Sequence, residues 1–214
     1  MTYTVFAQEV EGRTRTATVI TGIYVADEPG QPFFHAIVNE ALSGLWEKPK
    51  GKALLQAIIG AGPVDYRGYR ILISRVSISY EMALNGTIKP RGGRSYASPA
   101  QKQLGVASDA AQLHGEGVSA LVGWCQNQVV YTPQVGANRK PHFVPPSVTL
   151  GHELIHGLHA LNGDSKSGST IKIDGKDTSE EEAFTVGLGI YANAIHTENK
   201  LREDFNLPPR LSYP

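Results

Sequence analysis

The sequence has no excess charge of either sign, almost no cysteine and no long apolar run. Its 20 basic side chains balance 20 acidic ones, which excludes the basic footprint of most nucleic-acid-binding proteins and of polybasic membrane-surface proteins. No apolar run approaches the roughly 18 residues that a membrane helix needs. The N-terminal residues lack a basic segment followed by an apolar one, so no secretory signal peptide is expected.

Cys125 is the only cysteine, so no disulfide can form within the chain, which is compatible with a reducing cytosol. Its neighbour is Trp124 in an apolar run, and we expect Cys125 to be a buried small side chain. Apolar residues make up 41% of the 214 residues. This is enough for a core, and we expect one domain over residues 1–214.

Patterning predicts both helices and strands. Alternating β-branched and polar residues predict a strand or hairpin before residue 26, and a second strand is expected at 69–78. A glycine-rich, apolar-poor stretch at 85–117 predicts a loop, either a solvated linker or a flap that contacts substrate. Further segments are a short strand at 128–132, a polar loop at 163–177, and helices at 33–45, 50–59, 146–162, 179–195 and 198–205.

Residues 152–156 read H-E-x-x-H within a helix that begins after Pro145 and ends at Gly163. His152 and His156 are four residues apart, so they lie one turn apart on the same face. Two imidazoles in this arrangement converge on one Zn²⁺. Glu153 then lies beside the metal, where it can act as the general base for hydrolysis.

A catalytic zinc site needs a third protein ligand. His159 is close by, but three histidines on one straight helix cannot all converge on one ion, so we interpret His159 as structural. The run at 178–187 holds two overlapping capping-box patterns. If Thr178 caps the helix, Glu181 closes the box or supports a ligand, and Glu182 is free to become the third ligand.

The stretch 146–163, followed by an E-E-x-x-T-x-G pattern at 181–187, resembles the zinc site of clostridial neurotoxin light chains. That resemblance places the third ligand at Glu182. The short chain and the R-x-x-Y at its end are more similar to bacterial effector metalloproteases of the NleD type. The likeness covers roughly residues 128–214 and is weak over 1–127.

The resemblance implies that Arg210 and Tyr213 reach into the site. A guanidinium and a phenol hydroxyl aimed at the developing oxyanion would stabilise the transition state. Glu198 is a candidate to orient a ligand histidine or Arg210, although it also suits the first turn of a helix that Thr197 caps.

We therefore expect an α+β fold: a compact gluzincin-type zinc metalloprotease domain with a small mixed sheet and the H-E-x-x-H helix below the cleft. Residues 1–127 would supply strands, helices and the glycine-rich loop, and residues 128–214 the zinc site. The resemblance implies a zinc endopeptidase, monomeric, exported by a type III system into the host cytoplasm. A host protein, with a MAP kinase as candidate, would be the substrate; nucleic acid and membrane insertion are not expected. The alternatives are a zinc-holding interaction module without proteolysis and a cytosolic peptidase that is not an effector.

Overall fold

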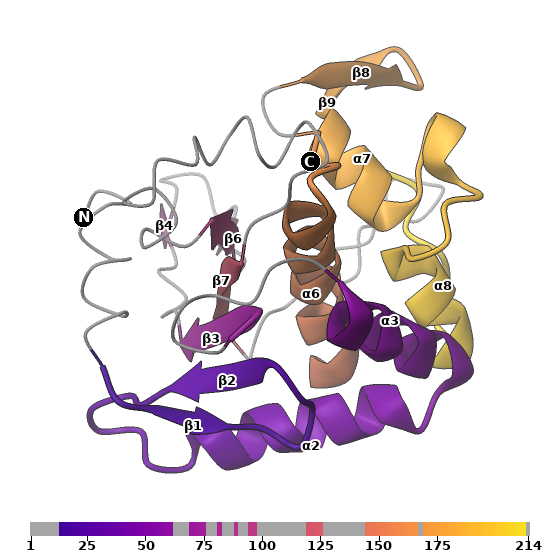
Figure 1. Cartoon of the computed structure of the whole chain (residues 1–214). Helices are drawn as coiled ribbons and strands as arrows, with labels where there is room; N and C mark the ends of the chain where they lie inside the picture. The colour runs from indigo at the N-terminus through magenta and orange to yellow at the C-terminus, as the bar shows by residue number, and fades with distance from the viewer. Residues whose placement is uncertain are drawn as a thin grey trace.

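The computed structural model describes residues 13–61, 69–75, 81–82, 88–89, 94–97, 119–125, 144–166 and 169–212. Helices and strands are both present, and the helices gather on one side of a sheet (Figure 1). None of the helices in these ranges is long and apolar enough to cross a membrane. The expected α+β fold is confirmed.

A five-stranded mixed sheet forms the centre of the fold, in the order β1-β2-β3-β7-β6. The three inner strands are parallel, and each edge strand runs antiparallel to its neighbour. This is the small mixed sheet that the sequence predicts. The strands are β1 (Arg15–Ala17), β2 (Ile23–Ala26), β3 (Ile71–Arg75), β6 (Arg94–Ala97) and β7 (Ala120–Trp124).

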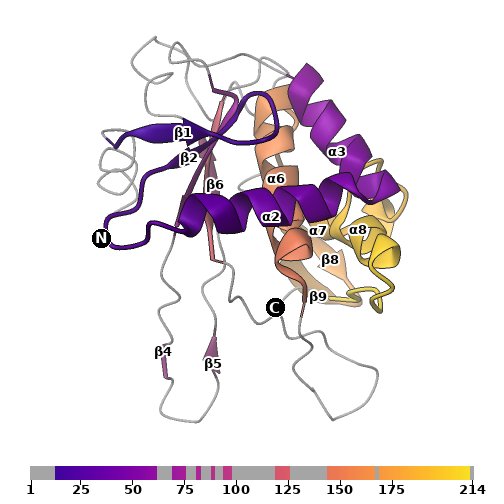
Figure 2. The same ribbon diagram turned by 90° about the horizontal axis from the view of Figure 1, so that it is seen from below.

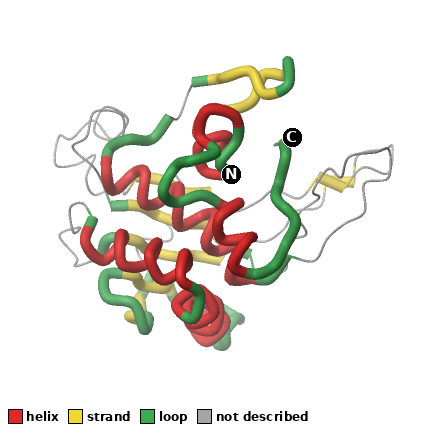
Figure 3. The backbone as a smooth tube through the Cα atoms, turned by 90° about the vertical axis from the view of Figure 1, so that its right-hand side faces the viewer, coloured by secondary structure: helices red, strands yellow, loops and turns green. Residues whose placement is uncertain are grey.

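Three helices cover one face of the sheet: α2 (Phe34–Trp46), α3 (Pro49–Gly60) and α6 (Pro146–Asn162) (Figures 2 and 3). Their apolar stripes pack with the inner strands into one core, which includes Leu42, Leu54, Ile73, Val122 and Leu154. Burial of these side chains is the main favourable term in folding. It fixes α6 against the sheet beside β6 and β7.

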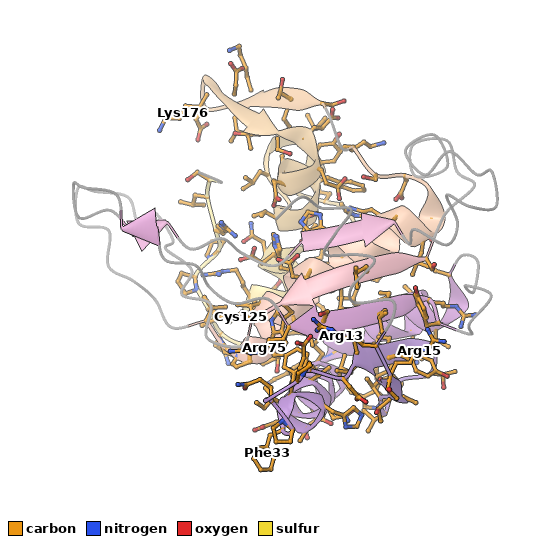
Figure 4. The ribbon with its side chains drawn as sticks, turned by 90° about the vertical axis from the view of Figure 1, so that its left-hand side faces the viewer. Arg13, Arg15, Phe33, Arg75, Cys125 and Lys176 are labelled. Carbon is orange, nitrogen blue, oxygen red and sulfur yellow. The ribbon has the colours of Figure 1, made fainter. Side chains whose placement is uncertain are left out.

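The opposite face of the sheet carries a smaller apolar cluster that includes Tyr69, Leu72 and Leu121. The guanidinium of Arg15 lies 5.4 Å from the centroid of the Tyr69 ring. Figure 4 looks onto this side of the molecule, with the sheet in front of the helices. Cys125 is buried, as the sequence predicts.

The C-terminal part adds short elements around α6. The hairpin of β8 (Thr170–Ile173) and β9 (Lys176–Ser179) leads directly into α7 (Glu180–Val186). A 3-10 turn, η1 (Gly189–Tyr191), connects α7 to α8 (Glu198–Asp204), and β4 (Glu81–Met82) and β5 (Ile88–Lys89) form a separate ribbon.

The helices expected at 33–45, 50–59, 146–162 and 198–205 are all present, and so are the hairpin before residue 26 and the strand within 69–78. Three expectations are wrong, and one strand was not predicted. Residues 88–89 and 94–97 form strands where a loop was expected, because backbone pairing with β4 and β7 outweighs their poor apolar content. Residues 120–124 form an unexpected central strand, which is buried along its whole length and so shows no alternation.

The polar stretch 163–177 is also not only a loop, because β8 and β9 pair around the turn at Asp174 and Gly175. Both turn residues have positive φ, 49° and 79°, as in the tight turns that join hairpin strands. The helix expected at 179–195 stops at Val186, because Gly187 adopts the left-handed conformation. The predicted strand 128–132 lies outside the described residues, as does most of the loop 85–117.

Candidate metal centre

Helix α6 presents His152 and His156 towards α7. Pro146 occupies the first turn of α6, and Gly163 ends the helix in the left-handed conformation at φ 68°. Leucines on the remaining faces, such as Leu150 and Leu154, are fully buried in the core. Because both sides of α6 are packed, the two histidines have little freedom to move apart.

Three ligand-type atoms converge in front of α6. Nε2 of His152 lies 3.2 Å from Nε2 of His156. Oε2 of Glu182, on α7, lies 3.4 Å from the first nitrogen and 3.5 Å from the second. The structure thus brings together the three residues that the sequence predicts as metal ligands.

This triangle has the size of a tetrahedral zinc site. Ligand atoms about 2.0–2.1 Å from a tetrahedral ion lie about 3.3–3.4 Å from one another. Each histidine uses its Nδ1 to hydrogen-bond a carboxylate, at 2.8 Å for His152 and 2.9 Å for His156. When each ring carries its proton on Nδ1, both Nε2 atoms are free to bind a cation. Two lone pairs and a carboxylate oxygen facing one another fit a cation.

Glu181 supports His156 and is not a helix cap. Its Oε1 accepts from Nδ1 of His156 at 2.9 Å and from Nδ1 of His159 at 2.8 Å. Its Oε2 accepts from the backbone N–H of Lys166 at 2.6 Å. Thr178 belongs to β9, and Ser179 makes no side-chain capping bond. The expected capping box is therefore wrong, because the Glu181 carboxylate is committed to the two histidines and the loop before β8.

Two further residues of the E-E-x-x-T-x-G pattern have visible roles. Oγ1 of Thr185 lies 3.0 Å from Nδ1 of His156. Gly187 ends α7 at φ 85°, and a Cβ there would lie 2.9 Å from the side chain of Thr197. Thr197 caps α8 by accepting from the N–H of Lys200 at 3.2 Å. The glycine therefore lets α8 approach the site.

Glu198, at the start of α8, supports His152. Its Oε2 accepts from Nδ1 of His152 at 2.8 Å and from Nη1 of Arg210 at 2.9 Å. Its Oε1 accepts from Nη1 of Arg202 at 3.0 Å. Glu198 thus contacts both of its expected partners, a histidine of the H-E-x-x-H motif and Arg210. Sequence reasoning missed Arg202, since a Glu–Arg pair four residues apart is typical of an exposed helix face.

The pKa values of Glu153 and Glu182 are shifted in opposite directions. Burial raises the pKa of Glu153 to about 7, and the neighbouring histidines oppose this shift. A carboxyl group with a pKa in this range can both take and return a proton near neutral pH. For Glu182, burial also favours the neutral acid, but His156 and His152 outweigh it and hold its pKa well below the usual range. Glu182 therefore keeps the charge that a metal ligand requires.

Two candidates remain, His159 and Tyr213. His159 is buried and stacks on Phe184, with ring centroids 4.0 Å apart, in agreement with a structural interpretation. A second group of His156, His159 and Glu181 is close enough to hold a metal. We assign it as hydrogen-bonded, because both Nδ1 atoms lie at donor distance from one carboxylate oxygen. Tyr213 lies outside the described residues, so its role stays a prediction.

The profile of peptidase family M91, described as "Effector protein", matches residues 25–213. The chain belongs to this family. Membership confirms the relationship to NleD-like effectors and agrees with the expected class of enzyme. No curated protein gave a significant match to the sequence.

Solved neurotoxin light chains share the fold of this M91 member. The botulinum type D light chain matches with a TM-score of 0.50 and 15% identity over 87% of this chain and 58% of its own. The serotype C1 light chain protease matches at 0.51 and 12% over 77% and 54%. A zinc-removed form of the type C light chain matches at 0.51 and 14% over 79% and 54%. The chain thus spans little more than half the length of these relatives, and such low identities show the fold alone.

Proposed function

We propose that this M91 family member is a zinc-dependent endopeptidase whose metal is bound by His152, His156 and Glu182. The observation that carries the proposal is the triangle of Nε2, Nε2 and Oε2 atoms, with edges of 3.2, 3.4 and 3.5 Å. Three protein ligands leave a fourth tetrahedral position for water or substrate, as in catalytic zinc sites. The type C light chain, which shares this fold, has been solved in an apo form from which zinc was removed.

Within the site, each residue has a separate task. When bound, the ion lowers the pKa of a water molecule and polarises the substrate carbonyl. Glu153 takes the proton from the attacking water and returns it to the leaving amine. Arg210 is held beside His152 through Glu198, and together with Tyr213 it is proposed to stabilise the oxyanion.

The proposed substrate is an extended segment of a host protein. Strand β6 is an edge of the central sheet and packs next to α6. An extended peptide can add to such an edge through backbone hydrogen bonds, which bind it with little sequence preference. Strand β6 offers such an edge within the described residues.

The setting of the reaction is likewise a proposal. The family description, "Effector protein", supports delivery into a host cell. We propose type III export into the host cytoplasm, a single monomeric domain over 1–214, and a host MAP kinase as the candidate substrate. The match over 25–213 supports treating this span as one unit.

The test compares new protein termini in host-cell lysate treated with the zinc-loaded wild type or with Glu153→Gln. Wild type should generate new termini, and Glu153→Gln should lower their rate of formation at least about a hundredfold, the usual contribution of a general base. Both proteins should hold one zinc per chain. Termini formed equally by both proteins would refute the role of Glu153. No new termini from either protein would favour the interaction module that binds zinc without cleaving.

A further inference from the structure

Arg202 is a fully buried charged residue next to the proposed zinc site. Its side chain has 0% exposure, although it lies on α8 among residues that also face solvent. Nη1 donates to Oε1 of Glu198 at 3.0 Å, and Nε donates to the backbone carbonyl of Pro208 at 2.7 Å. The side chain therefore connects Glu198 to the segment that follows α8.

The two oxygens of Glu198 have different partners. Oε1 is bonded to Arg202, whereas Oε2 is shared by Nδ1 of His152 and Nη1 of Arg210. A carboxylate held only through Oε2 could rotate about its last bond. Because Arg202 holds the other oxygen, Oε2 stays directed at His152, which fixes the orientation of that imidazole.

Arg202 also holds the chain that carries Arg210. The backbone carbonyl of Arg202 accepts from the N–H of Leu207 at 2.8 Å, and its Nε donates to the carbonyl of Pro208. Two residues further on, the side chain of Asn199 pairs with both the N–H and the carbonyl of Arg210, at 2.6 and 2.9 Å. Arg202 and Asn199 thus bind the C-terminal segment to α8 at successive points.

Stability alone is a weak reason for an arginine at this position. Burial lowers the pKa of Arg202, and Glu198 only partly opposes the shift. Its Nη2 is buried and has no hydrogen-bond partner among the described residues. The preceding residue, Leu201, shows that apolar side chains pack well against α6 here. Buried ion pairs are often no more stabilising than apolar residues of similar volume, so a role in orientation better accounts for the arginine.

We propose that Arg202 is a positioning residue: it fixes the Glu198 carboxylate so that His152 and Arg210 are both held in their working orientations. The proposal rests on the proposed zinc site. Its first readout is the affinity for Zn²⁺ alone, which does not depend on whether the protein cleaves peptides. A failure of the peptidase proposal, seen with Glu153→Gln, is therefore distinguishable from a failure of this one.

The experiment measures zinc dissociation constants by chelator competition for wild type, Arg202→Met and Arg202→Lys. Arg202→Met should weaken zinc binding about tenfold, the lower end of the effect of losing an outer hydrogen-bond partner. Arg202→Lys should fall in between, because one ammonium can contact Glu198 but cannot replace the planar fork that also holds Pro208. If Arg202→Met does not fold, Arg202→Lys decides the question.

A double-mutant cycle separates positioning from general stability. In a Glu198→Gln background, Arg202→Met should change zinc affinity less than about twofold, because the group through which it acts is altered. The matched control is Glu203→Gln, on the same helix as Arg202. It removes an exposed ion pair with Lys50 of α3 and should leave zinc affinity unchanged. Wild-type zinc affinity in both Arg202 variants, or equal losses in the two backgrounds, would overturn the proposal.

Discussion

A Cβ atom on Gly187 would lie 2.9 Å from both Cβ and Cγ2 of Thr197. This close approach joins the end of α7, which carries Glu182, to the start of α8, which carries Glu198. Gly187 also has φ 85°, a conformation that other residues adopt only with strain. The glycine of the E-E-x-x-T-x-G pattern is therefore required by the packing of two helices that supply residues to one site.

Gly187→Ala should destabilise the protein more than Gly175→Ala. Both glycines have positive φ, at 85° and 79°, but a Cβ on Gly175 meets nothing within 4 Å. The shared backbone strain costs about 1–2 kcal/mol, which corresponds to about 2–8 °C in Tm for a chain of this size. Gly187→Ala should lose clearly more, because Thr197 must also move.

Thermal melting of the two variants checks this expectation, with zinc affinity measured in parallel. Displacement of Thr197 shifts Glu198, so Gly187→Ala should also bind zinc more weakly, whereas Gly175→Ala should not. Equal losses of Tm in the two variants would mean that the contact with Thr197 contributes nothing.

Glu182→Ala should remove the third ligand and with it most of the stabilisation by zinc. In wild type, free zinc at about 100 times its dissociation constant should add about 2.7 kcal/mol to the free energy of unfolding. The control is Glu180→Gln, two residues before Glu182 on α7, whose carboxylate accepts from the Tyr191 hydroxyl.

The measurement is Tm with and without added zinc for the wild type and the two variants. Wild type and Glu180→Gln should show the full zinc-dependent rise, and Glu182→Ala only a small part of it. A full rise in Glu182→Ala would move the third ligand to another residue.

Features set by local chemistry could be predicted from the sequence. Pro146 and Gly163 bound α6, and the spacing of His152 and His156 places them on one face of it. The partners of these histidines are harder to predict. The capping pattern around Glu181 is a valid local signal, but two imidazoles and a backbone N–H compete for its carboxylate and outweigh it.

Other features depend on tertiary contacts that no local pattern records. Strand β7 is apolar throughout because helices cover one face and a small cluster covers the other, so the alternation expected of a strand is absent. Arg202 resembles a surface residue until α8 is packed against α6. The β8–β9 turn is different, since Asp174 and Gly175 form a recognisable hairpin signal that the polar composition of the segment obscured.

The C-terminal residues should be required for turnover and largely dispensable for folding. Arg210 is held by Asn199 through its backbone and by Glu198 through its side chain. If Arg210 and Tyr213 stabilise the oxyanion, each loss should lower kcat about 10²–10³-fold with little change in KM. Arg210→Lys should also be impaired, because a point charge cannot replace the planar fork.

The variants to compare are Tyr213→Phe, Arg210→Lys and a chain that ends at Pro209. Turnover is measured on a peptide that spans a cleavage site mapped in lysate, alongside Tm and zinc content. Asn199→Ala serves as a graded test, since it loosens the backbone of Arg210 without removing a proposed donor, and it should lower kcat less than Arg210→Lys does. The truncated chain should still fold, though with weaker zinc binding than wild type, because Glu198 loses the Arg210 contact. If it turns over within threefold of wild type, the oxyanion donors must lie elsewhere in the chain, and the basic segment at 89–94 would be the next to test.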